Sequence, residues 1–471
     1  MWVEEKTVCP ATPRFDFTES PGILVNISDD TLIQYFEYFF DNSMLELIVE
    51  ETNVYAEQCF HSQKSKMYSK QREWCATCKE EVIILLCIWI MQGIVKKPVE
   101  QWYWSKDEKL FTPFFRKLMS YRRYYYLKKY LHFPNNENYY PDTHPNQRLN
   151  KIWPIYSRIN ELSKNAVTLE QDVSIDESLL LHKGRLSWKQ YLPLKRARFG
   201  IKMYMLCEAK SGYVWSSIIF TGRGTLFDEE FLKPEFSKFM QVVLTLMKPL
   251  LNTVYCVTLD NYSSILTDTL VKCKTDSYGT INLNRKEVPS YVKSKKLKKG
   301  ETVAFRRGKA LILKWKDEKD VSLISTIHNS EIAVRSSREE KLKLKIVVDY
   351  NDTIWVASIV LTKIWHLMLS QENMGKSGSK SQLQFRLDLV NEMVIKYHSE
   401  SMGSKRGRPL LKTPLRLTER HFVKFIPPTE NKEKPARKCF ICCRKRNSDG
   451  KKIRTETRYY YEKWDVGHDV C

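Results

Sequence analysis

The sequence has no apolar run long enough to cross a membrane. Its strongest run, Val82–Met91, is well below the roughly 18–20 residues that a bilayer span needs, so it predicts a buried helix. The first residues, Met-Trp-Val-Glu-Glu-Lys, are charged and no apolar segment follows them, so we expect no signal peptide. The 12 cysteines are scattered except near the C-terminal end, which favours a reducing compartment over a disulfide framework.

Acidic residues are too few to balance the basic ones. The chain has 77 Lys and Arg against 55 Asp and Glu, a formal net charge of +22 and a pI near 9.3. Such an excess favours a polyanionic partner, because each neutralised phosphate releases a counterion. We therefore predict double-stranded DNA as the partner and no membrane, although an acidic lipid surface or a merely soluble basic protein also fits the charge.

Helical spacing dominates the first part of the chain. Residues 1–28 are rich in turn signals, and Asp29 or Asp30 then caps a helix that begins near Leu32. Helical spacing returns at Pro113–Leu131, where Tyr121–Tyr126 alternate with Arg and Lys. That mixture suits nucleic-acid contact, but helix packing explains such a stripe as well, and both interpretations stay open.

From about Val167 the pattern changes to short strands. A long helix is predicted at Phe231–Leu251, and the strands predicted around it are Val173–Asp176, Ile201–Cys207, Tyr213–Phe220 and Thr253–Leu259. The second and third of these strands form a hairpin, and we expect the fourth to be parallel to the first. This is the order in which an RNase H-like α/β fold begins.

A basic insertion is predicted at residues 285–345. It contains two strand-like pieces, Ala310–Trp315 and Val321–Ile327. A last strand is predicted at Lys345–Val348, leading into Asp349, and a helix at Gln382–Tyr397.

Two aspartates stand at predicted strand ends, Asp176 and Asp260. Metal-dependent phosphoryl transfer needs several carboxylates that hold two divalent cations about 4 Å apart. In sheet folds such carboxylates converge at strand ends. A strand-end Asp is also a common turn or cap residue, so the position alone leaves both interpretations open.

The residues around both aspartates resemble those of piggyBac transposases. The matching words are Asp176-Glu177-Ser178, Lys183-Gly184-Arg185, Lys189-Gln190-Tyr191-Leu192-Pro193, Phe199-Gly200-Ile201-Lys202, Leu259-Asp260-Asn261-Tyr262 and Gly279-Thr280. Upstream, Tyr35-Phe36-Glu37 and Leu47–Asn53 are similar to the start of the transposase body. The resemblance covers nearly the whole chain and is closest to the piggyBac transposable element-derived proteins.

The resemblance implies nicking at transposon ends, hairpin formation and insertion at TTAA, by three aspartates and a divalent metal such as Mg²⁺. It also implies a nuclear location and a possible homodimer. Two of the catalytic aspartates correspond to Asp176 and Asp260. The expected domains are an extended segment 1–28, a helical dimerisation and DNA-binding domain 29–166, an RNase H-like core 167–355, the truncated remainder of the helical domain with a basic linker 356–430, and a degenerate cysteine-rich tail 431–471.

The third aspartate of the family is missing. It should follow Val348-Asp349-Tyr350-Asn351 in a Gly-Val-Asp-x-x-Asp stretch, but no Asp occurs from Thr353 until Asp388. Asp349 and Asp352 are the only nearby substitutes. We therefore expect a domesticated or decayed transposase that binds DNA. An active cut-and-paste transposase with a substitute carboxylate and a non-functional, pseudogene-like product are the alternatives.

The tail retains part of a zinc motif. Cys439 and Cys442 have Cys-x-x-Cys spacing, and His468 and Cys471 could complete a single Cys3His site. The family's second Cys pair is replaced by Tyr461 and Trp464, so the resemblance no longer implies two zinc ions. A tail without metal fits the sequence equally well.

Several basic words are candidates for DNA contact. Lys405–Pro409 contains Arg-Gly-Arg and resembles an AT-hook core that lies in an A·T minor groove, although a solvated basic linker is equally consistent. Lys293–Lys299 and Arg444–Arg446 also suit nuclear import. The predicted DNA-binding residues are Lys183, Arg185, Lys195, Arg196, Lys295, Lys296, Lys298, Arg406 and Arg408.

Overall fold

The structure is a computed structural model that describes residues 2–5, 9–25, 27, 31–62, 74–137, 140–193, 198–335, 341–353, 381–398, 424–439, 443, 446, 450–451 and 455–460. The chain divides into two compact units, Met1–Ser404 and Lys405–Cys471. Within the described ranges, no helix is both long and apolar enough to span a bilayer.

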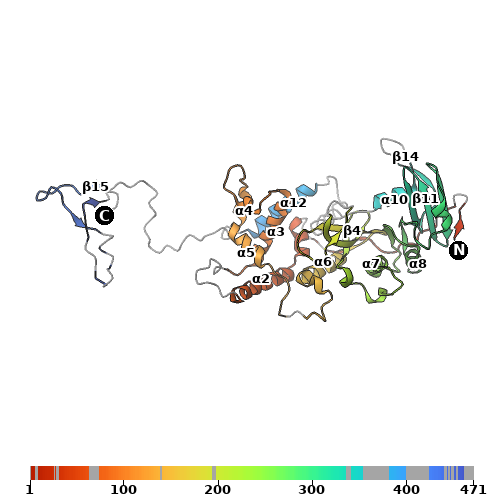
Figure 1. Cartoon of the computed structure of the whole chain (residues 1–471), viewed down its shortest axis with the longest axis horizontal. Coiled ribbons are helices and arrows are strands. Elements are labelled where there is room, and N and C mark those ends of the chain that lie inside the picture. The colour runs from red at the N-terminus through yellow and green to blue at the C-terminus, as the bar shows by residue number, and fades with distance from the viewer. Residues whose placement is uncertain are drawn as a thin grey trace. The chain divides into compact units, whose positions relative to one another are not determined.

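The first part of Met1–Ser404 is helical (Figure 1). Its helices are α1 (Leu32–Phe39), α2 (Asn42–Ser62), α3 (Lys79–Ile94), α4 (Pro113–Leu118), α5 (Tyr121–Tyr130) and α6 (Trp153–Ala166), with the short 3-10 helices η2 (Glu100–Trp104) and η3 (Gln147–Ile152). The helix α12 (Gln382–Tyr397) is distant from these helices in the sequence but packs against α1 and α3. Its Phe385 and Leu389 are fully buried. The helices expected from Val82–Met91 and at Gln382–Tyr397 are thus confirmed.

Local capping decides where the helices begin. The N-cap of α1 is Thr31, while Asp29 and Asp30 lie outside the described residues. The helix predicted at Pro113–Leu131 is divided in two, because Ser120 adopts an extended conformation and its hydroxyl accepts the Arg123 N–H at 3.2 Å. A side-chain oxygen at this position satisfies a donor that the first turn leaves unpaired.

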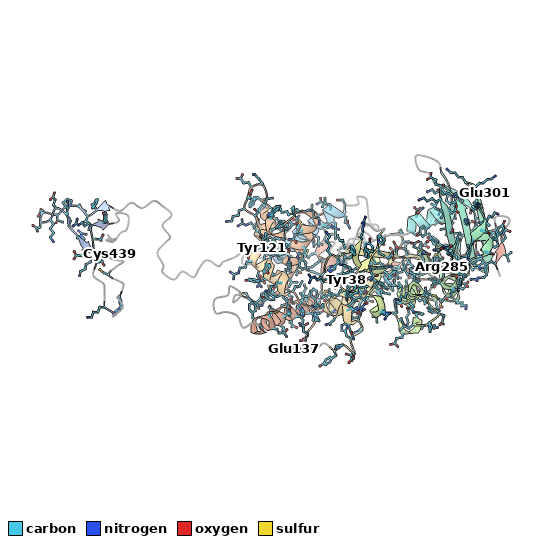
Figure 2. The ribbon with its side chains drawn as sticks, in the orientation of Figure 1. Tyr38, Tyr121, Glu137, Arg285, Glu301 and Cys439 are labelled. Carbon is cyan, nitrogen blue, oxygen red and sulfur yellow. The ribbon has the colours of Figure 1, made fainter. Side chains whose placement is uncertain are left out.

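The tyrosines of α5 serve helix packing. Tyr124 is 1% exposed, and its hydroxyl donates to Glu100 at 2.7 Å. The ring of Tyr124 lies 4.5 Å from that of Trp104, centroid to centroid. These contacts of Tyr124 favour helix packing over nucleic-acid contact for the middle of the stripe Tyr121–Tyr126. Figure 2 labels Tyr121, the first tyrosine of the stripe.

The rest of Met1–Ser404 is built on one large mixed sheet. Its strands lie in the order β1-β10-β11-β12-β9-β8-β4-β6-β5, with β7 also paired to β6. They are β1 (Val3–Glu4), β4 (Asp172–Leu181), β5 (Gln190–Tyr191), β6 (Phe199–Glu208), β7 (Val214–Ile219), β8 (Cys256–Leu259), β9 (Asp276–Thr280), β10 (Thr302–Arg307), β11 (Ala310–Lys316) and β12 (Asp320–Ser325). The other helices of this part are η4 (Gly222–Gly224), η5 (Glu229–Phe231), α7 (Lys238–Met247), η6 (Lys248–Leu250), α8 (Ser264–Lys272), α9 (Ser290–Ser294) and α10 (Lys345–Thr353).

Strand pairing at the centre of the sheet follows the expected pattern. Strand β4 is antiparallel to β6, and β6 is antiparallel to β7. Strand β8 is parallel to β4, with Ile175 opposite Leu259. The predicted hairpin and the predicted parallel pairing of the first and fourth strands are therefore confirmed.

Three sequence predictions about this region are wrong. The strand predicted at Lys345–Val348 is the start of helix α10, because the preceding hairpin β13 (Ile332–Arg335) and β14 (Lys341–Leu344) already ends at Leu344. The single helix predicted at Phe231–Leu251 is broken, since Ser237 caps a shorter α7. Asp176 lies inside β4 rather than at its end.

The predicted insertion is part of the main sheet. Strands β11 and β12 confirm the two strand-like pieces, and β12 pairs with β9. Strand β9, Asp-Ser-Tyr-Gly-Thr, was not predicted because its sequence is polar. Its Asp276 is fully buried, where it accepts from the Lys309 ammonium at 2.6 Å and from the Thr326 hydroxyl at 2.8 Å.

The N-terminal segment runs along the sheet in extended form. Its strand β1 pairs with β10, and β2 (Gly22–Ile23) pairs with β3 (Val167–Thr168). Between these pairings, the Arg14 guanidinium donates to Asp172 at 2.6 and 3.1 Å, and the Phe15 N–H donates to Asp276 at 3.0 Å. The segment therefore fixes the ends of β4 and β9.

The unit Lys405–Cys471 contains two short antiparallel ladders in its described part. Strand β15 (Lys424–Phe425) pairs with β18 (Tyr459–Tyr460), and β16 (Arg437–Lys438) pairs with β17 (Glu456–Thr457).

Candidate active site

Asp176 and Asp260 stand side by side on the sheet. The last residues paired between β4 and β8 are Ile175 and Leu259, and an aspartate follows each of them directly. Asp176 continues β4, whereas Asp260 is the first residue after β8. Positions that match in register on neighbouring strands lie about 5 Å apart and point to the same face. The structure confirms that the two strands leading to these aspartates are adjacent and parallel. That their carboxylates lie close enough to share a metal stays a prediction.

A glycine lets β9 approach Asp260 closely. Gly279 is opposite Leu259 and has φ +152°. A Cβ at this position would lie 1.8 Å from the Leu259 carbonyl oxygen, so no other residue fits without separating the strands. The next residue, Thr280, donates its hydroxyl to Asp260 Oδ1 and accepts the Asn261 N–H at 2.7 Å.

The phenol of Tyr350 also contacts Asp260. Its hydroxyl donates to Asp260 Oδ1 at 3.3 Å. Burial raises the pKa of Tyr350 well above its usual range, and the charges of Asp260 and Asp176 raise it further. Tyr350 is therefore a neutral donor that lies near both carboxylates.

Helix α10 is anchored on the sheet beneath this tyrosine. The Thr353 hydroxyl lies 3.0 Å from the Thr258 hydroxyl, and the Tyr278 hydroxyl donates to it at 3.0 Å. Thr353 and Tyr350 are three residues apart and so share one face of the helix. The contacts of Thr353 with β8 and β9 thus hold Tyr350 over Asp260.

The two proposed substitute carboxylates, Asp349 and Asp352, both lie on helix α10. Asp349 Oδ2 lies 2.9 Å from His328 Nε2, and the other ring nitrogen of His328 lies 2.8 Å from the Ser325 hydroxyl. Asp352 is exposed on the same helix. Among the residues that the structure describes, no group of three or more His, Cys, Asp or Glu side chains is arranged to hold a metal ion.

This donor set does not fit a pair of divalent cations. Two bridged metals need several carboxylate oxygens directed at one point. Here Asp176 and Asp260 are adjacent, but Asp260 already accepts from Thr280 and Tyr350. Asp349, a candidate third carboxylate within the described residues, is paired with His328 at 2.9 Å.

Five of the nine predicted DNA-binding residues are within the described part of the chain. Lys183 and Arg185 are exposed just beyond β4, and Lys296 and Lys298 are exposed beyond α9. The ammonium of Lys295 lies 5.2 Å from the centre of the Tyr291 ring. The other four, Lys195, Arg196, Arg406 and Arg408, lie outside the described residues.

One of the four predicted zinc ligands is described. Cys439 is buried in the unit Lys405–Cys471, where its N–H donates to the Thr455 carbonyl at 2.8 Å (Figure 2). The other three, Cys442, His468 and Cys471, lie outside the described residues.

Sequence reasoning did not identify Thr280, His328 or Tyr350 as site residues. Thr280 was within a matched word, Gly279-Thr280, and Tyr350 adjoins Asp349. His328 carried no signal, because its contact with Asp349 joins two segments that only the fold brings together.

Comparison with known proteins identifies the family. A family model described as Transposase IS4 matches residues 32–358, which is more than half of the chain. The chain therefore belongs to this transposase family, and its relatives are of the piggyBac type. PiggyBac transposable element-derived protein 3 of Homo sapiens is 26% identical over 390 residues, covering 78% of this chain and 61% of that protein.

Two further comparisons agree. PiggyBac transposable element-derived protein 2 of Homo sapiens is 26% identical over 192 residues, covering 41% of this chain and 29% of that protein. A solved piggyBac transposase synaptic complex with hairpin DNA matches with a TM-score of 0.67 at 20% identity, over 81% of this chain and 84% of that one. The chain thus spans about six tenths of protein 3 and shares the mixed α/β fold of piggyBac transposase.

Proposed function

We propose that this chain is a piggyBac-derived nuclear protein that binds double-stranded DNA and has lost metal-dependent strand cleavage. The observation that carries the proposal is the arrangement around Asp260. The Tyr350 phenol donates a hydrogen bond to its Oδ1, and His328 pairs with Asp349, a candidate third carboxylate. Both contacts oppose assembly of a two-metal site.

The scaffold we propose for this site is an RNase H-like core. Its support is the strand order β7-β6-β4-β8-β9, in which the first three strands along the chain form an antiparallel meander and the next two run parallel to the first. Asp176 lies on β4, the central strand of that set, and Asp260 directly follows the neighbouring strand β8.

The support for DNA as the partner comes from charge and from the structural relative. The net charge of +22 favours a polyphosphate, and the piggyBac transposase of similar fold is bound to hairpin DNA. Duplex binding by this chain should weaken steeply as salt rises. Fluorescence anisotropy with a labelled duplex across a salt series measures the slope. An absence of binding at low salt would contradict the proposal.

Strand cleavage is tested separately, with a duplex carrying family-type terminal repeats in Mg²⁺ or Mn²⁺. We expect no nicks or hairpins above the background of Asp176→Asn. Cleavage by the natural sequence that Asp176→Asn abolishes would overturn the loss of catalysis. Asp349→Asn and Asp352→Asn would then show which carboxylate completes the site. Glu372→Gln belongs to the same series, because Glu372 is the only acidic residue between Asp352 and Asp388 and lies outside the described residues.

Metal binding gives a readout that does not depend on activity. We expect Mn²⁺ to bind weakly and to gain affinity in Tyr350→Phe, because that variant leaves Asp260 Oδ1 without its phenol donor. Isothermal titration of both proteins measures the difference. Asp176→Asn in the Tyr350→Phe background is the control and should remove the gain.

A further inference from the structure

Two aromatic rings are exposed at one edge of the main sheet. Tyr191 of β5 is opposite Phe199 of β6, and their side chains are 53% and 48% exposed. The ring centroids are 4.6 Å apart and the planes are inclined by 32°. Strand β5 ends the sheet on this side. We call Tyr191 and Phe199 the aromatic pair.

The aromatic pair lies on the same face of the sheet as Asp176. Asp176 is opposite Met205 on β6, and alternate residues of a strand share a face, so Phe199 is on the Asp176 side. Tyr191 is directly opposite Phe199 and shares that face. At about 3.3 Å per residue, the aromatic pair is about 20 Å from Asp176 along the sheet.

Cations flank the aromatic pair in the sequence, and one of them contacts it. The segment 182–202 contains no Asp or Glu, and Lys183, Arg185 and Arg198 are exposed. The ammonium of Lys189 lies 5.4 Å from the centre of the Phe199 ring. The ion pair recorded in this segment joins Lys202 to Glu177; within the described part of the chain, none involves the three exposed cations.

We propose that the aromatic pair is a stacking platform for unpaired DNA bases. Exposed rings among cations suit a nucleic acid, because the rings stack on bases while the cations neutralise phosphates. A protein-docking surface is instead depleted of charge at its centre. The bases of a duplex are already stacked and present only their edges, so the ring faces require an unpaired strand.

This inference extends the proposed DNA binding, on which it rests, by naming the form of DNA that the sheet edge binds. A strand end that lies beside Asp176 and Asp260 would have its unpaired continuation over the aromatic pair, because both sites are on one face. The cations bind phosphates of paired and unpaired DNA alike, whereas the rings distinguish between them.

The test compares the full chain with a variant carrying Tyr191→Leu and Phe199→Leu. The substitutions keep apolar side chains but remove the ring faces, and half-exposed positions should tolerate them. Anisotropy is measured with a labelled poly-dT strand and with a duplex of equal length. We expect affinity for the single strand to fall about ten- to a hundredfold and affinity for the duplex to change by less than about twofold.

Two controls accompany this variant. Phe111→Leu changes an equally exposed ring, 52% exposed, outside the sheet and should affect neither DNA. Arg198→Gln should weaken binding of both DNAs and reduce the salt dependence. Melting temperatures of all variants check that each one folds.

The outcomes separate the two proposals. Equal losses on both DNAs, or no loss on the single strand, would overturn the platform while leaving duplex binding intact. A change of molecular mass in light scattering, with single-strand affinity unchanged, would show that the aromatic pair contacts a second copy of the chain and would also overturn it. A chain that binds poly-dT but no duplex would refute the proposed duplex binding and keep the platform.

Discussion

Replacing Gly279 by alanine tests the close approach of β9 to β8, the strand that ends just before Asp260. The new Cβ would lie 1.8 Å from the Leu259 carbonyl oxygen and 2.8 Å from its carbonyl carbon. Strands β8 and β9 must then separate, which costs about 1–3 kcal/mol as overpacking. The φ of +152° adds about 1–3 kcal/mol of backbone strain for a residue with a side chain.

We therefore expect Gly279→Ala to lower the free energy of unfolding by about 2–6 kcal/mol, measured by urea denaturation followed by tryptophan fluorescence. Two glycines with no atom within 4 Å of the new Cβ serve as controls. Gly308→Ala, at φ +57°, should cost about 1 kcal/mol. Gly93→Ala lies inside α3 and should stabilise the protein by about 0.5–1 kcal/mol. A cost for Gly279→Ala no larger than that for Gly308→Ala would refute the close packing of β8 and β9, and with it the position of Thr280 on Asp260.

Three other predictions concern stability and metal content. Burial raises the pKa of Tyr255 to about 12. The contribution of the neutral phenol to stability is therefore fully present below pH 10 and is lost as pH rises to 12, by about 1.4 kcal/mol per pH unit. Tyr255→Phe should reduce the fall of the melting temperature between pH 10 and 12, and an unchanged fall would contradict this. Arg123 pairs with Glu81 through two nitrogens, and both side chains are 18% exposed, so Arg123→Ala should lower the free energy of unfolding in urea by about 2–3 kcal/mol. The control is Lys79→Ala, which removes the exposed ion pair of Lys79 with Glu46 and should cost under about 0.5 kcal/mol. Equal costs for the two variants would refute the argument that burial strengthens the Arg123–Glu81 pair. Metal analysis of the purified chain should find at most one zinc ion per molecule, and Cys439→Ser should remove it. Two zinc ions per molecule would contradict the loss of the family's second zinc site.

The sequence predicted the centre of the sheet well because the signal there is local. Strands such as β6 and β7 are apolar, and a short turn joins them, so periodicity and turn residues locate the hairpin. Parallel pairing of β4 and β8 was expected from the order of three strands, a helix and a further strand, which is the order in which an RNase H-like fold begins. The polar strand β9 gave no such signal, because its Asp276 is satisfied by Lys309 and Thr326 from later in the chain.

The sequence by itself determined the family and predicted two aspartates of the site, Asp176 and Asp260, together with the loss of a third. Tertiary structure alone decided what surrounds them. Helix formation at α10, where a strand was predicted, turns Asp349 toward His328 and places Tyr350 on Asp260. These contacts join segments up to 90 residues apart in sequence. Local propensity cannot specify them, because their geometry depends on how the sheet packs against the helix.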